Sequence, residues 1–217
     1  MSARMAEASN ASWERLPLPG ADVRCAWSWL PQEAADALLE QLLQEIPWER
    51  HRLRMFGREL DAPRLSCWIG EPDAVYVYSR TRFEPRPWTP ALQALRERVQ
   101  RSCHAPFNSV LANLYRDGAD SMGWHSDDEP ELGPQPVIAS LSLGATRRFR
   151  LRRRLLRGTR AMPADTLDVP LTHGSLLCMS GATQHLYQHD VPKSARVSAP
   201  RINLTFRLIH APAGRPP

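Results

Sequence analysis

The segment Arg201-Ile202-Asn203-Leu204-Thr205-Phe206-Arg207-Leu208 alternates polar and apolar residues without a break. A period of two is typical of a β-strand whose two faces meet different surroundings. One face would carry Ile202, Leu204, Phe206 and Leu208. The opposite, polar face either meets water or lines a cavity between two sheets. We favour the cavity, because the strand carries two arginines and follows a candidate metal ligand.

The rest of the chain predicts short strands that follow two helices. Apolar residues at three- and four-residue steps predict a first helix between Pro31 and Pro47. Thr89-Pro90 predicts the start of a second helix, because threonine caps helices and proline suits their first turn. Strand patterns occupy residues 50–56, 74–79, 109–116, 137–143, 147–152, 166–171, 175–179 and 201–209. This order predicts an α+β protein built on a double-sheet jelly roll, or double-stranded β-helix, flanked by N-terminal helices.

Composition limits the class of protein. The 217 residues fit one compact domain, and a formal net charge of +5 suits a polyanionic partner. The four cysteines have no short spacing, which predicts free thiols in a reducing compartment. Residues 1–22 are polar and predict a flexible tail. We find no signal peptide and no run of about 18 apolar residues, so we expect a cytoplasmic protein without a membrane partner.

Two histidines and one carboxylate form a candidate metal site. His125-Ser126-Asp127 and the later His189 match the facial triad that holds Fe(II) and leaves coordination positions open. A His-x-Asp pair alone is weak evidence, since most such pairs on a surface are merely solvated. Arg201 and Arg207 strengthen it, because two arginines on one strand face could clamp a small dicarboxylate such as 2-oxoglutarate. The set as a whole predicts an iron oxygenase.

The strand at 109–116 repeats this arrangement. Asn113 and Tyr115 share a face with Leu111 on an otherwise apolar strand. Buried amide and phenol groups need hydrogen-bond partners. A bound dicarboxylate would supply acceptors for both.

Five segments keep a characteristic order and spacing: Asn113–Tyr115, Trp124–Glu129, His173–Leu176, Gln188–Pro192 and Pro200–Arg207. Together they resemble the AlkB family of Fe(II)- and 2-oxoglutarate-dependent dioxygenases, which use O2 to demethylate alkylated nucleobases. The resemblance is greatest to the branch that includes the eukaryotic nuclear DNA-repair enzymes. It implies a nucleotide-recognition lid within residues 23–108 and a dioxygenase jelly roll over residues 109–217, in one compact domain.

The resemblance also implies roles for single residues. Iron would be held by His125, Asp127 and His189. 2-Oxoglutarate would be held by Asn113, Tyr115, Arg201, Asn203, Thr205 and Arg207, with Arg201 on its distal carboxylate. His185 is a competing candidate, but only His189 precedes the short apolar-proline segment that follows the ligand histidine in the family. We therefore expect His185 to be a surface histidine or a neighbour of the site.

Substrate contacts are expected upstream of the metal ligands. Phe56 matches a finger that fills the gap left by a flipped base, although a lone aromatic of this kind can simply pack on the core. Tyr76 and Tyr78 match aromatics that border the base pocket, or are ordinary residues of an amphipathic strand. Arg64 matches a residue of the DNA-facing region.

Two charged segments complete the predicted substrate side. By resemblance, Asp128 and Glu129 lie beside the base, where a carboxylate would favour cationic lesions; alternatively, Asp128 only orients a neighbouring arginine. The arginine-rich segment 147–154 is either a phosphate-contacting patch or a solvated strand edge.

The resulting hypothesis is direct-reversal repair of N1-methyladenine and N3-methylcytosine in DNA by a monomeric bacterial enzyme, with release of formaldehyde and succinate. A demethylase for RNA or single strands would use the same chemistry. A jelly-roll binding module without catalysis is the third possibility, and the complete ligand set argues against it.

Overall fold

The structure, a computed structural model, describes residues 12–55, 58–78, 81–155 and 162–210. Within the hairpins at 53–60 and 76–83 only the backbone is described. The larger sheet has seven strands in the order β1 (Glu14–Arg15), β2 (Asp22–Ala26), β13 (Leu176–Ser180), β10 (Ile138–Gly144), β15 (Arg201–Arg207), β8 (Ser109–Tyr115) and β5 (Leu65–Gly70).

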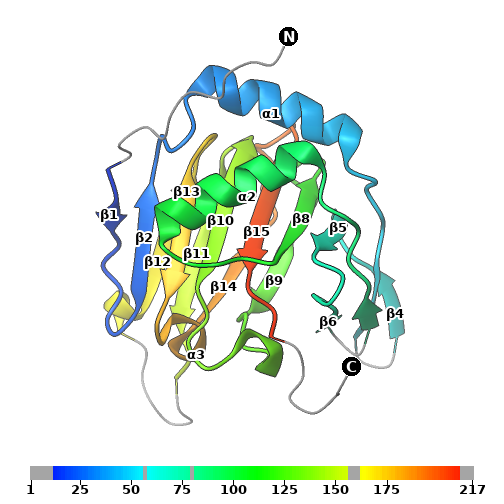
Figure 1. The fold of residues 1–217 in the computed structure, drawn as a ribbon. Helices are drawn as coiled ribbons and strands as arrows, with labels where there is room; N and C mark the ends of the chain where they lie inside the picture. Colours follow the sequence, from blue (N-terminus) through cyan, green and yellow to red (C-terminus); the bar gives the residue numbers. More distant parts are fainter. Residues whose placement is uncertain (1–11, 56–57, 79–80, 156–161, 211–217) are drawn as a thin grey trace.

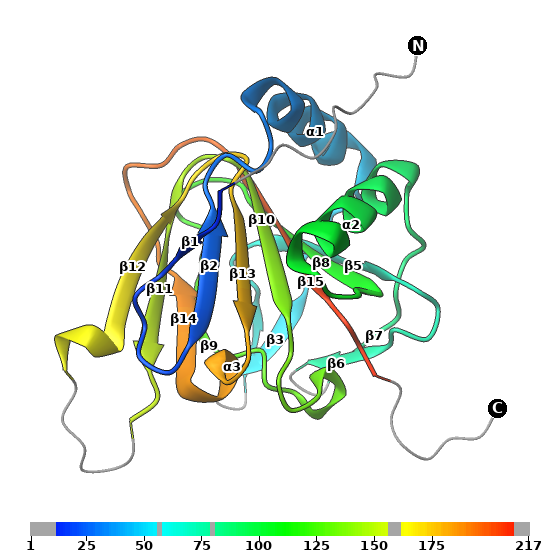
Figure 2. The same cartoon turned by 60° about the vertical axis from the view of Figure 1, so that its left-hand side comes forward.

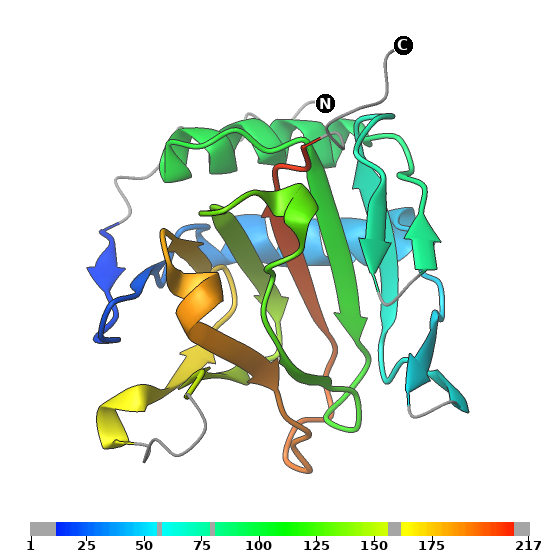
Figure 3. The same cartoon turned by 90° about the horizontal axis from the view of Figure 1, so that it is seen from below.

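A smaller sheet faces the larger one. Its four strands run in the order β12 (Thr166–Leu171), β11 (Arg147–Arg153), β14 (Tyr187–Val191) and β9 (Met122–His125). Two separate hairpins, β3 (Arg52–Met55) with β4 (Arg58–Asp61) and β6 (Tyr76–Tyr78) with β7 (Thr81–Phe83), lie to one side of the sheets, far from β12 (Figure 3). The hairpins occupy the region for which a nucleotide-recognition lid is predicted.

The helices cover the outer face of the seven-stranded sheet (Figures 1 and 2). They are α1 (Gln32–Glu45) and α2 (Pro90–Cys103). The other helical elements are short: α3 (Thr183–Leu186) and the 3-10 turns Pro130–Leu132 and Pro163–Asp165. The Thr89 side chain accepts from Leu92 N at the start of α2, as the sequence predicts. No described helix has the length and apolar character needed to cross a membrane.

Two apolar clusters hold these layers together. The first lies between the helices and the large sheet, and it contains Ile202, Leu204 and Phe206 at 0% exposure. The second lies between the two sheets and contains Phe149 and Leu151 of β11. The predicted faces of β15 are therefore correct: its apolar residues face the helices, and its polar residues face the space between the sheets.

The predicted tail over residues 1–22 is wrong for its second half. Glu14–Arg15 pair with β2, and Leu16 and Leu18 are only 6% and 5% exposed in the second cluster. The segment is polar on average, but its two leucines, Leu16 and Leu18, pack into the second apolar cluster and hold residues 14–18 against the sheet. The sequence analysis assigned the jelly roll to residues 109–217, but the large sheet also contains earlier strands. β2 and β5 pair with β13 and β8, which follow residue 108.

Candidate active site between the two sheets

The candidate metal ligands come together from two neighbouring strands, β9 and β14. His189 of β14 is the antiparallel partner of His125, the last residue of β9, and Asp127 follows two positions later. One ligand atom from each of the three lies within 4.8 Å of the others. His189 and Asp127 are 5% and 3% exposed. Three donors converging in a buried place fit a facial triad.

Neighbouring groups orient each ligand. His125 Nδ1 lies 2.9 Å from Gly123 O, which leaves Nε2 for a metal. The His189 ring lies 4.2 Å from the His125 ring and 5.1 Å from the Phe149 ring, measured between centroids. Arg207 Nη2 donates to Asp127 Oδ1 at 2.8 Å. Partners of this kind fix a ligand before the metal arrives.

The protonation states of the three groups suit metal binding. Burial opposes the charge on Asp127, but Arg207 and the two histidines outweigh it and lower the pKa of this carboxyl to about 2. Burial, with His125 beside it, lowers the pKa of His189 to about 3, and burial also lowers the pKa of His125. Near neutral pH the site therefore presents one carboxylate and two neutral imidazoles, which are the forms that coordinate metals.

Five of the six predicted co-substrate residues line the space beside the triad, and the sixth, Arg201, is the strand partner of one of them, Tyr115. The cavity beside the triad is bordered by Asn113, Tyr115, Asn203, Thr205 and Arg207, together with all three candidate ligands. Two serines of β10 that the sequence analysis missed support them. Arg201 Nη2 donates to Ser142 Oγ at 2.9 Å, and Asn203 Nδ2 donates to Ser140 Oγ at 2.7 Å. The inward faces of β8, β10 and β15 thus form one polar wall.

Arg201 has unused hydrogen-bonding capacity. Its side chain is 1% exposed, yet Nε and Nη1 have no hydrogen-bond partner among the described residues. Burial lowers the pKa of Arg201 to about 10, Tyr115 acts in the opposite direction, and Arg147 adds to the lowering. A buried cation with unpaired donors is costly unless an anion binds it. The free donors of Arg201 therefore suit a small carboxylate ligand.

His185 lies outside the ligand cluster. It belongs to the short helix α3, and its Nε2 contacts Pro134 O. The described residues that gather as potential metal ligands are His125, Asp127 and His189. This agrees with the predicted choice of His189 as the third ligand.

Arg64 lies inside the molecule, whereas we expected it on a DNA-facing surface. It is 6% exposed, and its Nε donates to Asn113 Oδ1 at 2.8 Å. This hydrogen bond orients Asn113, which lines the cavity. The sequence could not distinguish the two positions, because an arginine after proline carries no periodic pattern.

The remaining predicted substrate residues are placed only in part. Asp128 forms an ion pair with Arg154, with 2.5 Å between Oδ2 and Nη1. This favours the alternative in which Asp128 orients an arginine. Glu129 immediately precedes the turn Pro130–Leu132 and is half-buried. Tyr76 and Tyr78 share one face of β6 in backbone terms, and Phe56 lies outside the described residues.

The arginine-rich segment has two faces. Arg148, Arg150 and Arg152 point outward, and the last two lie over the Trp124 ring, with guanidinium-to-centroid distances of 5.0 and 4.1 Å. Arg147 does not belong to this outer patch, because it is 2% exposed. It has the same parity along β11 as the inward-facing Phe149 and Leu151, and that parity could have identified it from sequence.

Comparison with known proteins identifies the family. A family model described as the 2OG-Fe(II) oxygenase superfamily matches residues 22–207. Human alpha-ketoglutarate-dependent dioxygenase alkB homolog 3 is 45% identical over 192 residues, 84% of this chain and 64% of that protein. The human DNA oxidative demethylase ALKBH2 is 36% identical over 206 residues, 93% of this chain and 78% of that protein. This chain belongs to the AlkB family of 2OG-Fe(II) oxygenases.

A solved structure of the same fold supports the assignment. The structure of OsALKBH1 superposes with a TM-score of 0.62 at 16% identity, covering 90% of this chain and 99% of that one. At this identity the likeness concerns the fold, and it confirms the predicted jelly roll. The chain spans 64% of the length of human alkB homolog 3, a little under two thirds.

AlkB-family membership also confirms the predicted cofactors, Fe(II) and 2-oxoglutarate. The residues present fit both. The triad offers the ligand types that Fe(II) takes, and the unpaired Arg201 donors suit the distal carboxylate of 2-oxoglutarate. The roles of the single wall residues remain predictions.

Proposed function

We propose that this chain demethylates N-alkylated bases in DNA by oxidation, with N1-methyladenine and N3-methylcytosine as substrates and formaldehyde and succinate as products. The observation that carries this is the gathering of His125, Asp127 and His189 beside a cavity bordered by β15, a strand that also carries Arg201, a buried arginine with two donors unpaired among the described residues. The names of the relatives support the direction, since human ALKBH2 is a DNA oxidative demethylase.

Bound Fe(II) and 2-oxoglutarate would activate O2, the oxidant: one oxygen atom would hydroxylate the N-methyl group and the other would enter succinate as 2-oxoglutarate loses CO2, and the hydroxymethyl base then loses formaldehyde. The protein supplies orientation and charge. Arg207 keeps Asp127 ionised and holds one of its oxygens, while Gly123 O fixes the tautomer of His125. Arg201 and Arg207 are both at most 3% exposed, so water competes little for a carboxylate bound to them.

Contact with nucleic acid would use the outer face of the four-stranded sheet. Arg148, Arg150 and Arg152 project from β11, and the formal net charge of the chain is +5. Arginines that alternate along a strand can contact successive phosphates without reading sequence. The partners of Arg152 among the described residues, Gln188 Oε1 and the Trp124 ring, are neutral, so its charge is available to a phosphate.

RNA or single-stranded nucleic acid is the alternative substrate within the same chemistry. The name of human alkB homolog 3 specifies a dioxygenase and no nucleic acid. Phe56 distinguishes the alternatives, because a wedge residue matters only where a stacked duplex has to be opened. We further propose that the protein acts as a monomer in the bacterial cytoplasm, at the nucleoid.

The test is a demethylation assay with methylated adenine or cytosine, each in duplex and single-stranded DNA, alongside matched RNA strands. Release of formaldehyde that requires Fe(II), 2-oxoglutarate and O2 on the DNA strands supports the proposed reaction. The Phe56→Ala variant should lose activity on duplex DNA and largely keep it on single strands. Activity on RNA alone would mean that RNA is the substrate of the same reaction. No turnover on any strand would refute the proposed reaction.

A further inference from the structure

Arg147 is a buried arginine of β11, and neither the metal site nor the outer arginine patch uses it. It begins β11, and its side chain is 2% exposed. A buried guanidinium needs several acceptors to offset the loss of water. Its neighbours therefore indicate what it is for.

Three backbone carbonyls from two loops hold the Arg147 side chain. Nη1 donates to Asp117 O at 2.9 Å, and Nη2 donates to Asp120 O at 2.7 Å and to Pro192 O at 2.8 Å. Asp117 and Asp120 belong to the turn between β8 and β9, and Pro192 begins the loop between β14 and β15. One side chain thus joins the β8–β9 turn to the β14–β15 loop.

The same two loops are packed backbone to backbone. Gly118 N donates to Val197 O, and Ser194 N donates to Gly118 O, both at 2.8 Å. A Cβ added at Gly118 would lie 1.7 Å from Ser194 O. This closeness requires glycine and leaves the position of Arg147 well fixed.

Arg147 also shares an aromatic ring with the predicted carboxylate clamp. Its guanidinium carbon lies 5.4 Å from the centroid of the Tyr115 ring, and that of Arg201 lies 5.3 Å from the same centroid. Tyr115 is also the strand partner of Arg201 between β8 and β15. Two like charges over one ring repel each other, and a carboxylate bound at this end would relieve the repulsion.

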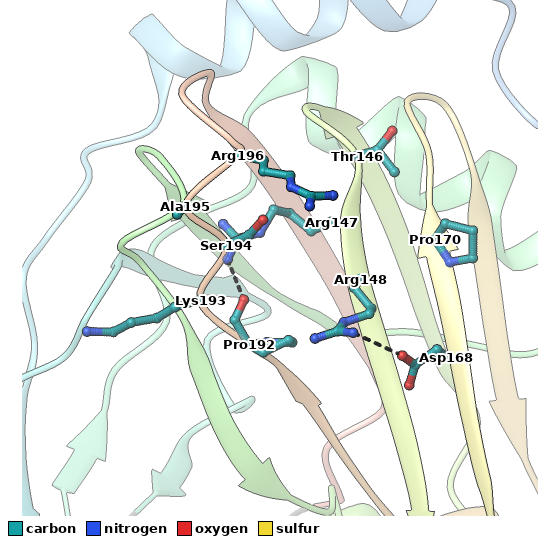
Figure 4. A pocket seen from close by; sticks show the side chains of 10 residues that line it. All are labelled: Thr146, Arg147, Arg148, Asp168, Pro170, Pro192, Lys193, Ser194, Ala195 and Arg196. Atoms are coloured by element: carbon teal, nitrogen blue, oxygen red, sulfur yellow. Dashed lines mark hydrogen bonds and ion pairs between the residues drawn. The ribbon is translucent and has the colours of Figure 1, made fainter.

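Arg147 separates this clamp from an outer cavity. Figure 4 looks into that surface cavity, of about 590 Å³, which Arg147 lines with Arg148, Lys193 and Arg196. On its other side Arg147 covers Tyr115, which lines the inner cavity. A shorter side chain here would open a path for water toward the clamp.

We propose that Arg147 is a positioning residue for the co-substrate: it fixes Tyr115 and Arg201 and adds positive charge where the distal carboxylate of a five-carbon keto dicarboxylate binds. This role rests on the proposed function, because it requires 2-oxoglutarate in the inner cavity. It is distinct from a purely structural role, because it depends on the second carboxylate of the ligand.

The test compares two keto acids that differ in that carboxylate. The affinities of 2-oxoglutarate and of 2-oxobutyrate, which lacks the distal carboxylate, are measured by calorimetry on the protein loaded with Mn(II) without oxygen. The variants are Arg147→Gln and Arg147→Lys. Arg148→Gln is the matched control, since Arg148 is the next residue of the strand, points outward and pairs with Asp168.

In Arg147→Gln we expect 2-oxoglutarate to bind about tenfold more weakly or worse, and 2-oxobutyrate to bind nearly as before. Arg147→Lys should lower the ratio of 2-oxoglutarate affinity to 2-oxobutyrate affinity by less than Arg147→Gln does. Lysine keeps the positive charge and loses only the planar contacts of the guanidinium. Arg148→Gln should leave both affinities unchanged. If Arg147→Gln does not fold, the ratio in Arg147→Lys decides.

An unchanged affinity ratio in a folded Arg147 variant would overturn this role, whether the binding of both keto acids is weakened equally or not at all. Arg147 would then only hold the two loops together. A wild-type protein that binds no 2-oxoglutarate would instead refute the proposed function.

Discussion

The strands β15 and β11 both carry arginines in alternation with apolar residues, and the fold uses them in opposite ways. On β15 the arginines face the cavity, and Arg201 and Arg207 are 1% and 3% exposed. On β11 the alternating arginines face outward, and the side chains of Arg148 and Arg150 are 57% and 31% exposed. Arg148 and Arg150 pair with carboxylates of the protein, Asp168 and Asp190. Arg201 keeps two buried donors without a partner among the described residues, and such donors indicate a ligand.

The largest effect is expected at the metal site, because the inward face of β15 can serve catalysis only if the triad binds Fe(II). We expect His189→Ala to abolish metal binding and turnover, since it removes one of the three candidate ligands. His185→Ala is the control and should keep most activity, because His185 contacts a backbone carbonyl elsewhere. Metal content and formaldehyde release measure both. The reverse pattern would mean that the ligand is assigned to the wrong histidine.

Two adjacent residues of β15 sharpen the contrast between its faces. Ile202→Ala should lower the free energy of unfolding by about 2–5 kcal/mol, because a fully buried side chain leaves a cavity against the helices. Arg201→Ala should weaken 2-oxoglutarate binding by about 2–3 kcal/mol, the scale of a hydrogen bond to a charged group and its desolvated partner. Thermal unfolding and ligand titration separate the two effects. Unchanged 2-oxoglutarate binding in Arg201→Ala would count against an inward clamp.

On β11 the expected effect is smaller and depends on salt. Arg152→Gln should weaken DNA binding several-fold and lower the slope of log affinity against log salt by about one, as loss of one phosphate contact does. Demethylation of a short single strand at saturating concentration should stay near the wild-type level. DNA titrations at several salt concentrations test this. A slope that does not change would mean that Arg152 contacts no phosphate.

The smallest effect is expected at Asp128. The sequence suggests that this carboxylate selects cationic lesions, but Arg154 already pairs with it, and exposed pairs of this kind are worth at most about 1 kcal/mol. Asp128→Asn should therefore change the ratio of turnover on N3-methylcytosine and N3-methylthymine by less than about tenfold. Arg154→Gln, which frees the carboxylate, should raise the preference for the cationic lesion. A large loss on the cationic lesion alone in Asp128→Asn would mean that the pair opens when substrate binds.

The sequence predicted the parts of the site that lie on regular, alternating strands. β15 and β8 were identified with their correct inward faces, because four apolar residues and four polar ones left little choice of register. The two ligand strands were not predicted. β9 is four residues with a glycine, and β14 carries Gln188, His189 and Asp190 in succession, so neither shows an apolar alternation.

Contacts between distant segments could not be predicted from any local pattern. Ser140 and Ser142 support Asn203 and Arg201 only because β10 pairs with β15. The interior position of Arg64 follows from its hydrogen bond to Asn113, 49 residues away. Sequence patterns indicate which face of a strand is polar. Which polar group meets which depends on the order of strands in the sheets.

The central claim is that the inward faces of the two sheets bind Fe(II) and 2-oxoglutarate together, and titration of the protein with both in the absence of oxygen tests it most directly. A keto acid chelated to Fe(II) gives a visible charge-transfer absorption that neither component gives alone. We predict that this absorption appears in the wild-type protein and in Arg148→Gln, is absent in His189→Ala, and requires a higher 2-oxoglutarate concentration in Arg201→Ala. Absence of the absorption in the wild-type protein, or an Arg201→Ala titration that superposes on it, would contradict the account.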